Sequence, residues 1–248
     1  MNKGGDDCGR WFDFVTAILL SSILFLPMVI SALLVWMEDQ GSPIYVAKRI
    51  GKDGRAFGLF KLRTMVPDAD KAGIDTTAND DKRITRVGRV LRSTKMDEIP
   101  QLLNVLKGEM SFVGPRPQVE AEVRLYTALE RGLLAVKPGI TDPASIIFAD
   151  LGAIMKGYPD ANLAYNQLVR PWKSKLGLFY IENKSCLSDL VILVGTVVTI
   201  FWKKGARMIV EKMLKRQRAP NDLIELARYR ELKPMAPPGA DDIVRFRG

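Results

Sequence analysis

An almost unbroken apolar run over residues 11–37 limits the fold of this chain more than any other feature. A helix needs only about 20 apolar residues to cross a bilayer, and this run is longer. Pro27 lies near its middle, where a proline removes one backbone hydrogen bond and bends a helix. The run by itself favours a kinked spanning helix, because such helices are common. A helix-break-helix that enters and leaves the same leaflet remains open.

Composition narrows the chemistry. The net charge of +9 on 248 residues predicts an anionic partner such as nucleic acid, a lipid surface or a phosphorylated substrate. The chain has no histidine, which excludes histidine acid–base catalysis, Ser-His triads and histidine-rich metal sites. Cys8 and Cys186 are too few for a disulfide framework or a zinc site. Covalent catalysis would therefore use a carboxylate, hydroxyl, thiol or amine.

A β-hairpin is predicted after the apolar run, because an Asp-Gly turn at 53–54 separates two β-prone segments, 44–50 and 55–63. In the second strand Lys61 and Arg63 share one face. A basic helix then follows at 82–96, where no acidic residue occurs. A solvated helical face is the ordinary interpretation of such a run, and a face for phosphates or lipid headgroups is the alternative.

Two adjacent carboxylates, Asp97 and Glu98, come next at a predicted helix start. Pro100 fits the first turn of a helix. One buried stripe is expected to follow, formed by Ile99, Leu102, Leu103 and Leu106, with Gly108 as the C-terminal cap. The positive end of a helix keeps a carboxylate ionised and attracts phosphate. For an isolated Asp-Glu pair, however, simple capping of the helix is the default interpretation.

Later segments add an arginine held between prolines, Pro115-Arg116-Pro117, and a constrained loop at 137–143. Residues 190–202 are apolar but too short to span a bilayer, and Lys203 and Lys204 follow. A helix at an anionic membrane surface and a buried core helix both fit this pattern.

In this order, the segments closely resemble the bacterial sugar transferases, the monotopic polyprenyl-phosphate phosphoglycosyl transferases. The resemblance covers residues from about 10 to about 202. Several ordered motifs carry it, and together they are far more specific than any one of them. They are Gly41-Ser42-Pro43-Ile44-Tyr45, Lys61-Leu62-Arg63-Thr64-Met65, Asp97-Glu98-Ile99-Pro100-Gln101, Gly114-Pro115-Arg116-Pro117 and Pro138-Gly139-Ile140-Thr141.

The resemblance implies transfer of a sugar-1-phosphate from a UDP-sugar to undecaprenyl phosphate through a covalent aspartyl-phosphosugar intermediate. UMP is released, and surface glycan synthesis begins. It makes Asp97 the nucleophile and gives Glu98 a part in binding Mg²⁺. By family position Arg92 is the first phosphate ligand. Lys61, Arg63 and Arg116 are further candidates for the diphosphate or the uridine.

The implied fold is α+β and mostly helical, in a monotopic membrane protein. Residues 1–40 form a re-entrant hairpin broken at Pro27. Residues 41–205 form the catalytic domain, with an interfacial helix near 188–203, and residues 206–248 form an extension. The implied location is the cytoplasmic face of the bacterial inner membrane. Membrane lipid is an expected partner, a homo-oligomer is left open, and nucleic acid is not expected.

Two departures from the family pattern stand out. Many relatives have Ser where this chain has Leu26, and Gly where it has Asp142-Pro143. The competing hypothesis is a non-catalytic membrane-anchored adaptor whose basic helix binds anionic lipid or nucleic acid. Few aromatic residues lie among those basic residues, which argues against single-stranded nucleic acid.

Overall fold

The computed structural model describes residues 4–69, 81–156, 158, 160–229 and 232–244. Helices dominate these residues and the strands form two small sheets, so the predicted mostly helical α+β class is confirmed. The strands are β1 (Ile44–Ile50), β2 (Ala56–Leu62), β3 (Ser111–Val113) and β4 (Gly139–Thr141). The helices up to β4 are α1 (Gly4–Asp39), η1 (Lys52–Gly54), α2 (Arg86–Thr94), η3 (Met96–Gln101), α3 (Leu102–Leu106), α4 (Glu120–Arg124) and η4 (Glu130–Ala135). Those after it are α5 (Pro143–Ile147), α6 (Leu151–Ile154), α7 (Ala161–Leu168), α8 (Arg170–Asn183), α9 (Cys186–Phe201), α10 (Lys203–Arg216) and α11 (Asn221–Tyr229).

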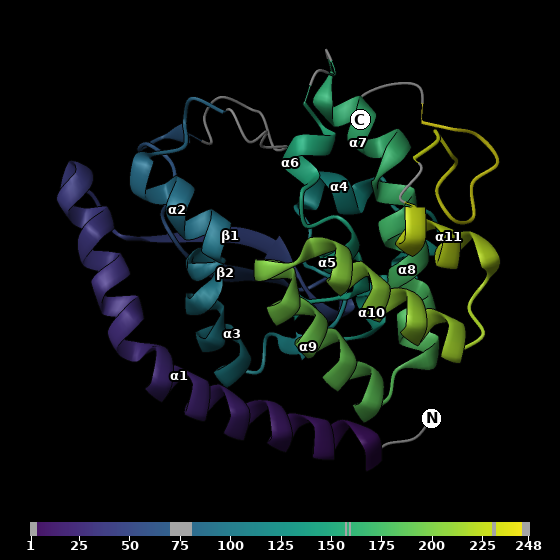
Figure 1. Cartoon of the computed structure of the whole chain (residues 1–248), viewed down its shortest axis with the longest axis horizontal. Helices are drawn as coiled ribbons and strands as arrows, with labels where there is room; N and C mark the ends of the chain where they lie inside the picture. Colours follow the sequence, from purple (N-terminus) through teal and green to yellow (C-terminus); the bar gives the residue numbers. More distant parts are fainter. Residues whose placement is uncertain (1–3, 70–80, 157, 159, 230–231, 245–248) are drawn as a thin grey trace.

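The apolar run forms α1, a continuous helix that contains Pro27. It follows one rim of the molecule and changes direction along its length (Figure 1). Ala17 and Val35 are buried on its inner side, whereas Ile23 is 69% exposed. Among the described residues, α1 is the one helix long and apolar enough to cross a membrane. The helix is not interrupted at Pro27, so the re-entrant break there stays a prediction.

The β-hairpin is confirmed, because β1 and β2 pair antiparallel along their whole length. Asp53 and Gly54 adopt left-handed backbone angles at its tip, with φ of 56° and 75°. Asp and Gly accept this conformation more readily than other residues do. The local turn chemistry therefore accounts for the position of the hairpin.

The segment after the basic helix differs in part from its prediction. Residues 96–101 form a 3-10 helix, η3, with Pro100 inside it, and the α-helix begins only at Leu102. Leu102 is buried as expected, but Leu103 is 46% exposed, so its place in the buried stripe was wrong. Gly108 has a φ of 77°, as expected for the cap of a helix.

Asn104 holds this segment against the hairpin. The side chain is fully buried; its oxygen accepts a hydrogen bond from the Phe60 N–H at 3.0 Å, and its nitrogen donates to the Gly58 carbonyl at 2.7 Å. The same nitrogen donates to Glu109 at 2.7 Å. An amide group thus supplies contacts that a neighbouring strand would otherwise make, and it fixes η3 and α3 beside β2.

The C-terminal third packs α9, α10 and α11 against α5 and α8 (Figure 1). Ile192, Val210, Leu214 and Leu223 are almost completely buried there. The predicted interfacial helix corresponds to α9, whose outer side includes Phe201 at 84% exposure. Beyond it, the described residues of the predicted extension 206–248 dock on the domain. One of its contacts is the Thr127 hydroxyl donating to the Pro238 carbonyl at 2.5 Å.

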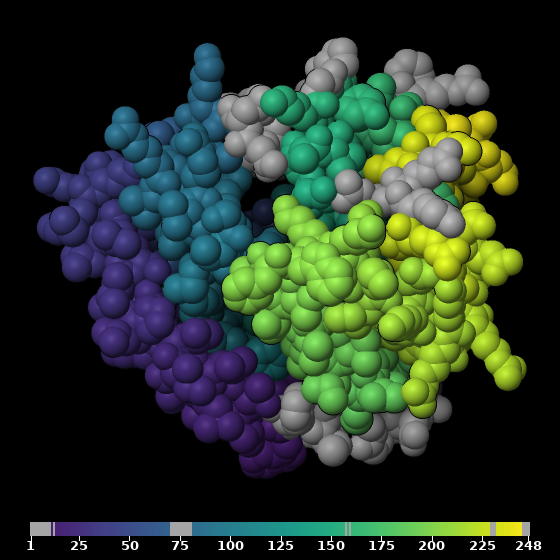
Figure 2. Space-filling view, in the orientation of Figure 1, coloured from purple at the N-terminus to yellow at the C-terminus, as the bar shows by residue number. Residues whose placement is uncertain are grey.

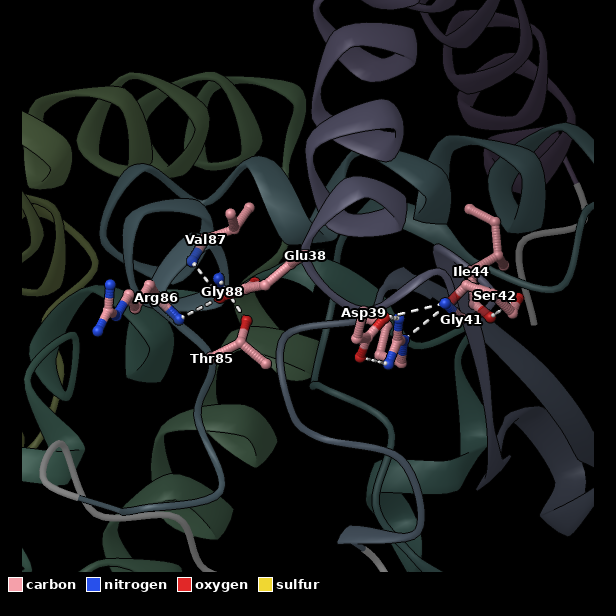
Figure 3. Close-up of polar contacts among 10 residues, drawn as sticks. Glu38, Asp39, Gly41, Ser42, Ile44, Thr85, Arg86, Val87 and Gly88 are labelled. Atoms are coloured by element: carbon pink, nitrogen blue, oxygen red, sulfur yellow. Dashed lines mark hydrogen bonds and ion pairs between the residues drawn. The ribbon is translucent and has the colours of Figure 1, made fainter.

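Two carboxylates at the end of α1 attach this helix to the rest of the protein (Figure 3). Glu38 accepts hydrogen bonds from the first backbone N–H groups of α2, at 2.8 Å from Arg86 and 3.4 Å from Val87. Asp39 binds both terminal nitrogens of Arg63 at 2.5 Å. A carboxylate at a helix N-terminus and a two-pronged arginine pair are both strong polar contacts.

We expect Arg63→Met to lower the free energy of unfolding by about 1–2 kcal/mol, because it removes a two-pronged charge-assisted pair whose side chains are only 13% and 27% exposed. Thermal unfolding of the purified protein in one detergent measures the change. Arg124→Met is the matched control, since its pair with Glu120 is exposed and should leave the melting temperature unchanged. Equal shifts for both variants would contradict the expectation.

Candidate active site

The two adjacent carboxylates lie where α2 gives way to η3. The chain reverses at Lys95, which has a left-handed φ of 61°, and Asp97 and Glu98 occupy the first turn of η3. Asp97 is 8% exposed, and no described residue donates a hydrogen bond to its carboxylate. It therefore differs sharply from Glu98, whose two carboxylate oxygens each accept a hydrogen bond.

Glu98 forms a two-pronged ion pair with Arg116. The two arginine nitrogens lie 2.8 and 2.9 Å from the two carboxylate oxygens, and Arg116 also donates to the Ile140 carbonyl at 2.8 Å. Such fork-to-fork geometry fixes both groups in orientation as well as position. Glu98 and Arg116, both predicted site residues, are thus brought together.

Arg116 is positioned by two motifs, residues 114–117 and 138–141, which meet where β3 and β4 form a parallel sheet. β3 pairs with β4, the Gly114 N–H donates to the Thr141 carbonyl at 3.0 Å, and the Gly139 N–H donates to the Pro115 carbonyl at 3.1 Å. A Cβ atom at Gly139 would lie 2.1 Å from the Gly114 nitrogen, so only glycine allows this approach. The two motifs predicted from sequence are therefore one structural unit.

The two carboxylates have opposite pKa shifts. Burial tends to raise the pKa of Glu98, but Arg116 and Lys61 outweigh it and the net shift is downward. Burial, and then the charge of Glu98, raise the pKa of Asp97, against the opposing charge of Lys61. A helix start by itself would lower the pKa of Asp97, but desolvation dominates at this position and the net shift is upward.

Lys61 and Arg92 lie close to the carboxylates. Burial lowers the pKa of Lys61, and the charges of Glu98 and Asp97 oppose that shift. The Nε of Arg92 donates to the Thr64 hydroxyl at 2.8 Å. Burial also lowers the pKa of Arg92, and the charge of Asp97 counteracts it. Asp97 and Glu98 are called the dyad below. Both cations are held near the dyad, and neither forms a direct ion pair with it among the described residues.

Arg63, by contrast, is not brought to this group. Its guanidinium binds Asp39 and donates through Nε to the Ser42 carbonyl at 2.7 Å. Alternation along the strand predicts Lys61 and Arg63 on one face, but α1 supplies a partner for Arg63 from outside the hairpin. This arginine therefore secures α1, and its predicted substrate contact has no support from the geometry.

A cavity of about 600 Å³ opens beside the dyad. Its polar part includes Arg92, Lys95, Glu98 and Arg116, whereas Asp97 lies next to this lining and is not part of it. Its apolar part includes residues of two helices that carry exposed apolar side chains, with Leu20 and Leu24 from α1 and Ile200 from α9. Figure 2 shows a hollow between the blue surface of α2 and the green surface near the end of α9. The cavity combines a cationic region with an apolar region.

A divalent metal would have few protein ligands here. No cluster of three or more carboxylate or thiol groups occurs in the part of the chain that the structure describes. Mg²⁺ often binds through one or two carboxylates together with substrate phosphates and water. Glu98 lines the cavity, and each of its oxygens keeps a second lone pair beside the Arg116 contact. The residues therefore fit an ion that arrives with a phosphorylated substrate.

The sequence alone does not identify Thr64 and Lys95 as site residues. Thr64 is 7% exposed and orients Arg92, while Lys95 turns the chain and lines the cavity. The signal for Thr64 is its place in the Lys61-Leu62-Arg63-Thr64 motif, but its partner is distant in sequence. Gly88 allows α2 to pack closely against Thr64, since a Cβ atom at residue 88 would lie 2.2 Å from the Thr64 carbonyl oxygen.

The family follows from comparison with known proteins. A model described as bacterial sugar transferase matches residues 7–203. The chain belongs to the bacterial sugar transferase family. This confirms the family identified from the ordered motifs and the prediction of an enzyme. Together with the long apolar helix α1, it also indicates that this sugar transferase associates with a membrane.

Several relatives carry descriptive names. This sugar transferase is 35% identical to the exopolysaccharide production protein ExoY of Sinorhizobium fredii, over 79% of this chain and 87% of the relative. It is 39% identical to the UDP-glucose:undecaprenyl-phosphate glucose-1-phosphate transferase of Caulobacter vibrioides, over 79% of this chain and 71% of the relative. The UDP-galactose-lipid carrier transferase of Erwinia amylovora is 32% identical over 79% of this chain, and the match spans only 41% of that relative.

We expect Asp97→Asn to stabilise this sugar transferase at neutral pH, because it removes a carboxylate whose ionisation burial and Glu98 oppose. The pKa of Asp97 is raised in the folded state. The loss of folding stability caused by ionised Asp97 is therefore absent below its ordinary pKa of 3.8 and complete above the raised pKa. The gain in melting temperature should shrink as the pH falls toward 3.8, which thermal unfolding across a pH series measures.

Glu98→Gln is the control of opposite sign. It leaves Arg116 without its carboxylate and should lower the free energy of unfolding by about 1.5–3 kcal/mol at neutral pH, because the pair is partly buried. The pKa of Glu98 is lowered in the folded state, so this difference is present above its ordinary pKa of 4.5 and diminishes as the pH falls. A lower melting temperature for Asp97→Asn at neutral pH would contradict the assignment.

Proposed function

We propose that this sugar transferase moves a sugar-1-phosphate from a UDP-sugar to undecaprenyl phosphate and releases UMP. The single observation that carries the proposal is the pairing of a buried Asp97, free of hydrogen bonds from described residues, with a Glu98 neutralised by Arg116. Only one of the two carboxylates is then available to attack. The names of relatives that include undecaprenyl phosphate support the choice of acceptor.

The reaction takes two displacements at one phosphorus atom. A carboxylate oxygen of Asp97 bonds to the β-phosphorus of the donor, and the bond from that phosphorus to the bridging oxygen breaks. UMP leaves with the electron pair, and the sugar phosphate stays on Asp97. An oxygen of the lipid phosphate then bonds to the same phosphorus and releases the Asp97 carboxylate. The first step needs Asp97 deprotonated, and the second step returns Asp97 as a free carboxylate.

Cations around the dyad lower the charge barrier to these steps. Arg92, Lys95 and Arg116 line the cavity and suit the phosphate oxygens, whose negative charge would otherwise repel a carboxylate. Lys61 lies near both carboxylates and offsets their charge. When bound with the donor, Mg²⁺ would add further charge neutralisation, held on the protein side by Glu98.

The acceptor would enter from the bilayer. Outward-facing apolar residues of α1 and α9 adjoin the cavity, and Lys203 lies at its rim. A polyprenyl chain needs an apolar path, whereas its phosphate needs cations, and the cavity offers both. We place the enzyme on the cytoplasmic face of the inner membrane, where it would begin synthesis of a surface glycan.

Asp97→Asn should reduce UMP release at least 10³-fold, because an amide does not attack phosphorus in this way. The assay measures UMP from purified enzyme with undecaprenyl phosphate and a panel of UDP-sugars. Asp53→Asn is the matched control, since Asp53 lies at the exposed hairpin tip and Asn tolerates its positive φ. Near-normal activity of Asp97→Asn would overturn the nucleophile assignment.

The re-entrant topology predicts that both ends of the chain face the cytoplasm. In a variant that lacks Cys8 and Cys186, single cysteines introduced as Asn2→Cys or Ala240→Cys should resist a membrane-impermeant maleimide in intact cells. Both should react after the cells are opened. Labelling of one end alone in intact cells would instead establish a spanning α1 and reject the hairpin.

A further inference from the structure

A second, smaller cavity of about 50 Å³ lies against the first. Arg116 and Ser145 line both cavities, so the two adjoin at these side chains. A cavity of 50 Å³ has room for about four water molecules. The small cavity is therefore large enough for an edge of a sugar ring and too small for a nucleoside. The side chains that matter here are Arg116, Asp142, Ser145, Tyr165, Arg170 and Lys173.

Lys173 is the most unusual group in this cavity. It projects from α8, and its amine lies 3.5 Å from the Tyr165 hydroxyl and 5.1 Å from the centre of the Tyr165 ring. No carboxylate of a described residue lies within 4.0 Å of that amine. Burial lowers the pKa of Lys173, although Asp142 and Glu122 oppose the shift. A desolvated amine with such weak partners is costly unless a ligand with acceptor atoms uses it.

Two further polar atoms of the cavity residues have no partner. The Ser145 hydroxyl and the Nε of Arg170 are buried without a hydrogen bond among the described residues. Their neighbours are well satisfied: Arg170 binds buried Glu130 through Nη2 at 2.7 Å, and Asp142 accepts from the Ser145 N–H at 2.6 Å. Buried polar groups without partners are rare in native proteins. The orphaned atoms here gather at one cavity.

The chemistry of the lining suits a neutral polar group. Lys173, Ser145 and Arg170 can donate hydrogen bonds, and Asp142 can accept one. Tyr126 and Tyr165 contribute aromatic surface to the same cavity. Charges of both signs occur, which does not favour an anion over a cation. Hydroxyl and acylamino groups of a sugar both donate and accept, and they match this mixture.

We propose that the small cavity receives the hydroxyl- or acylamino-bearing edge of the donor sugar, with Lys173 and Ser145 as specificity-determining residues. The inference rests on the proposed function, because it takes the donor phosphate to lie at Arg116. Arg116 lines both cavities, so a β-phosphate bound there would lie between them. The larger cavity, with its apolar region, would receive the lipid, and the small cavity lies on the other side. The sugar bonded to that phosphate reaches the small cavity, and the nucleoside lies elsewhere.

The test compares the donor with its nucleotide part. Full-length Lys173→Met and Ser145→Ala enzymes are assayed for UMP release against UDP-sugar concentration, and UDP is used as a competitive inhibitor. Each variant should raise KM for the best UDP-sugar about 10-fold or more, since the donor loses a buried hydrogen bond. The inhibition constant of UDP should stay within about twofold of wild type. Lys175→Met is the matched control on the same helix, because Lys175 pairs with Asp222 instead, and it should leave KM unchanged.

Other outcomes overturn the inference in distinct ways. An inhibition constant for UDP that rises together with KM would assign the cavity to the nucleotide. An unchanged KM in both variants would leave the cavity without a part in donor binding. If Lys173→Met fails to fold, Ser145→Ala and Lys173→Arg decide, because both keep most of the packing. Wild-type enzyme that releases no UMP from any UDP-sugar contradicts the proposed function itself, and the inference with it.

Discussion

The partly buried pair between Glu98 and Arg116 is the interaction on which the rest of the site depends. It joins η3 to the segment after β3, and through the Ile140 carbonyl it also includes β4. Separation of these charges would leave each one shielded from most of the solvent without its partner, which is costly. The pair also divides two neighbouring carboxylates by function, because the pKa of Glu98 falls while that of Asp97 rises. Environments that push two adjacent acids apart are typical of catalytic sites.

Local chemistry explains what could be predicted from the sequence. The Asp53-Gly54 turn, the left-handed Gly108 and the amphipathic character of α9 each depend on residues close together in the chain. The dyad and Arg116 were identified through ordered motifs, and the structure joins them in space. Lys61 was named as a site candidate through the family resemblance, and the structure places it near the two carboxylates because β2 lies against η3.

Partners that are distant in sequence explain what could not be predicted. Side-chain alternation along the strand puts Arg63 on the same face as Lys61, yet Arg63 forms an ion pair with Asp39 of α1 instead. The upward pKa shift of Asp97 depends on burial by the assembled fold, which a helix-start pattern does not contain. Lys173 belongs to none of the ordered motifs, and only packing brings it near Arg116.

The contacts at the end of α1 have a consequence for the enzyme as a whole. Glu38 accepts a hydrogen bond from the first turn of α2, the helix that carries Arg92. Asp39 forms an ion pair with Arg63, which follows directly after the strand that carries Lys61. A hydrogen bond and an ion pair therefore tie α1 to the two elements that carry Arg92 and Lys61. Under the proposed function, the depth of α1 in a bilayer would set the height of these two cations relative to the lipid headgroups. The length of α1 that enters the lipid would then decide whether the cavity lies level with the phosphate of the acceptor.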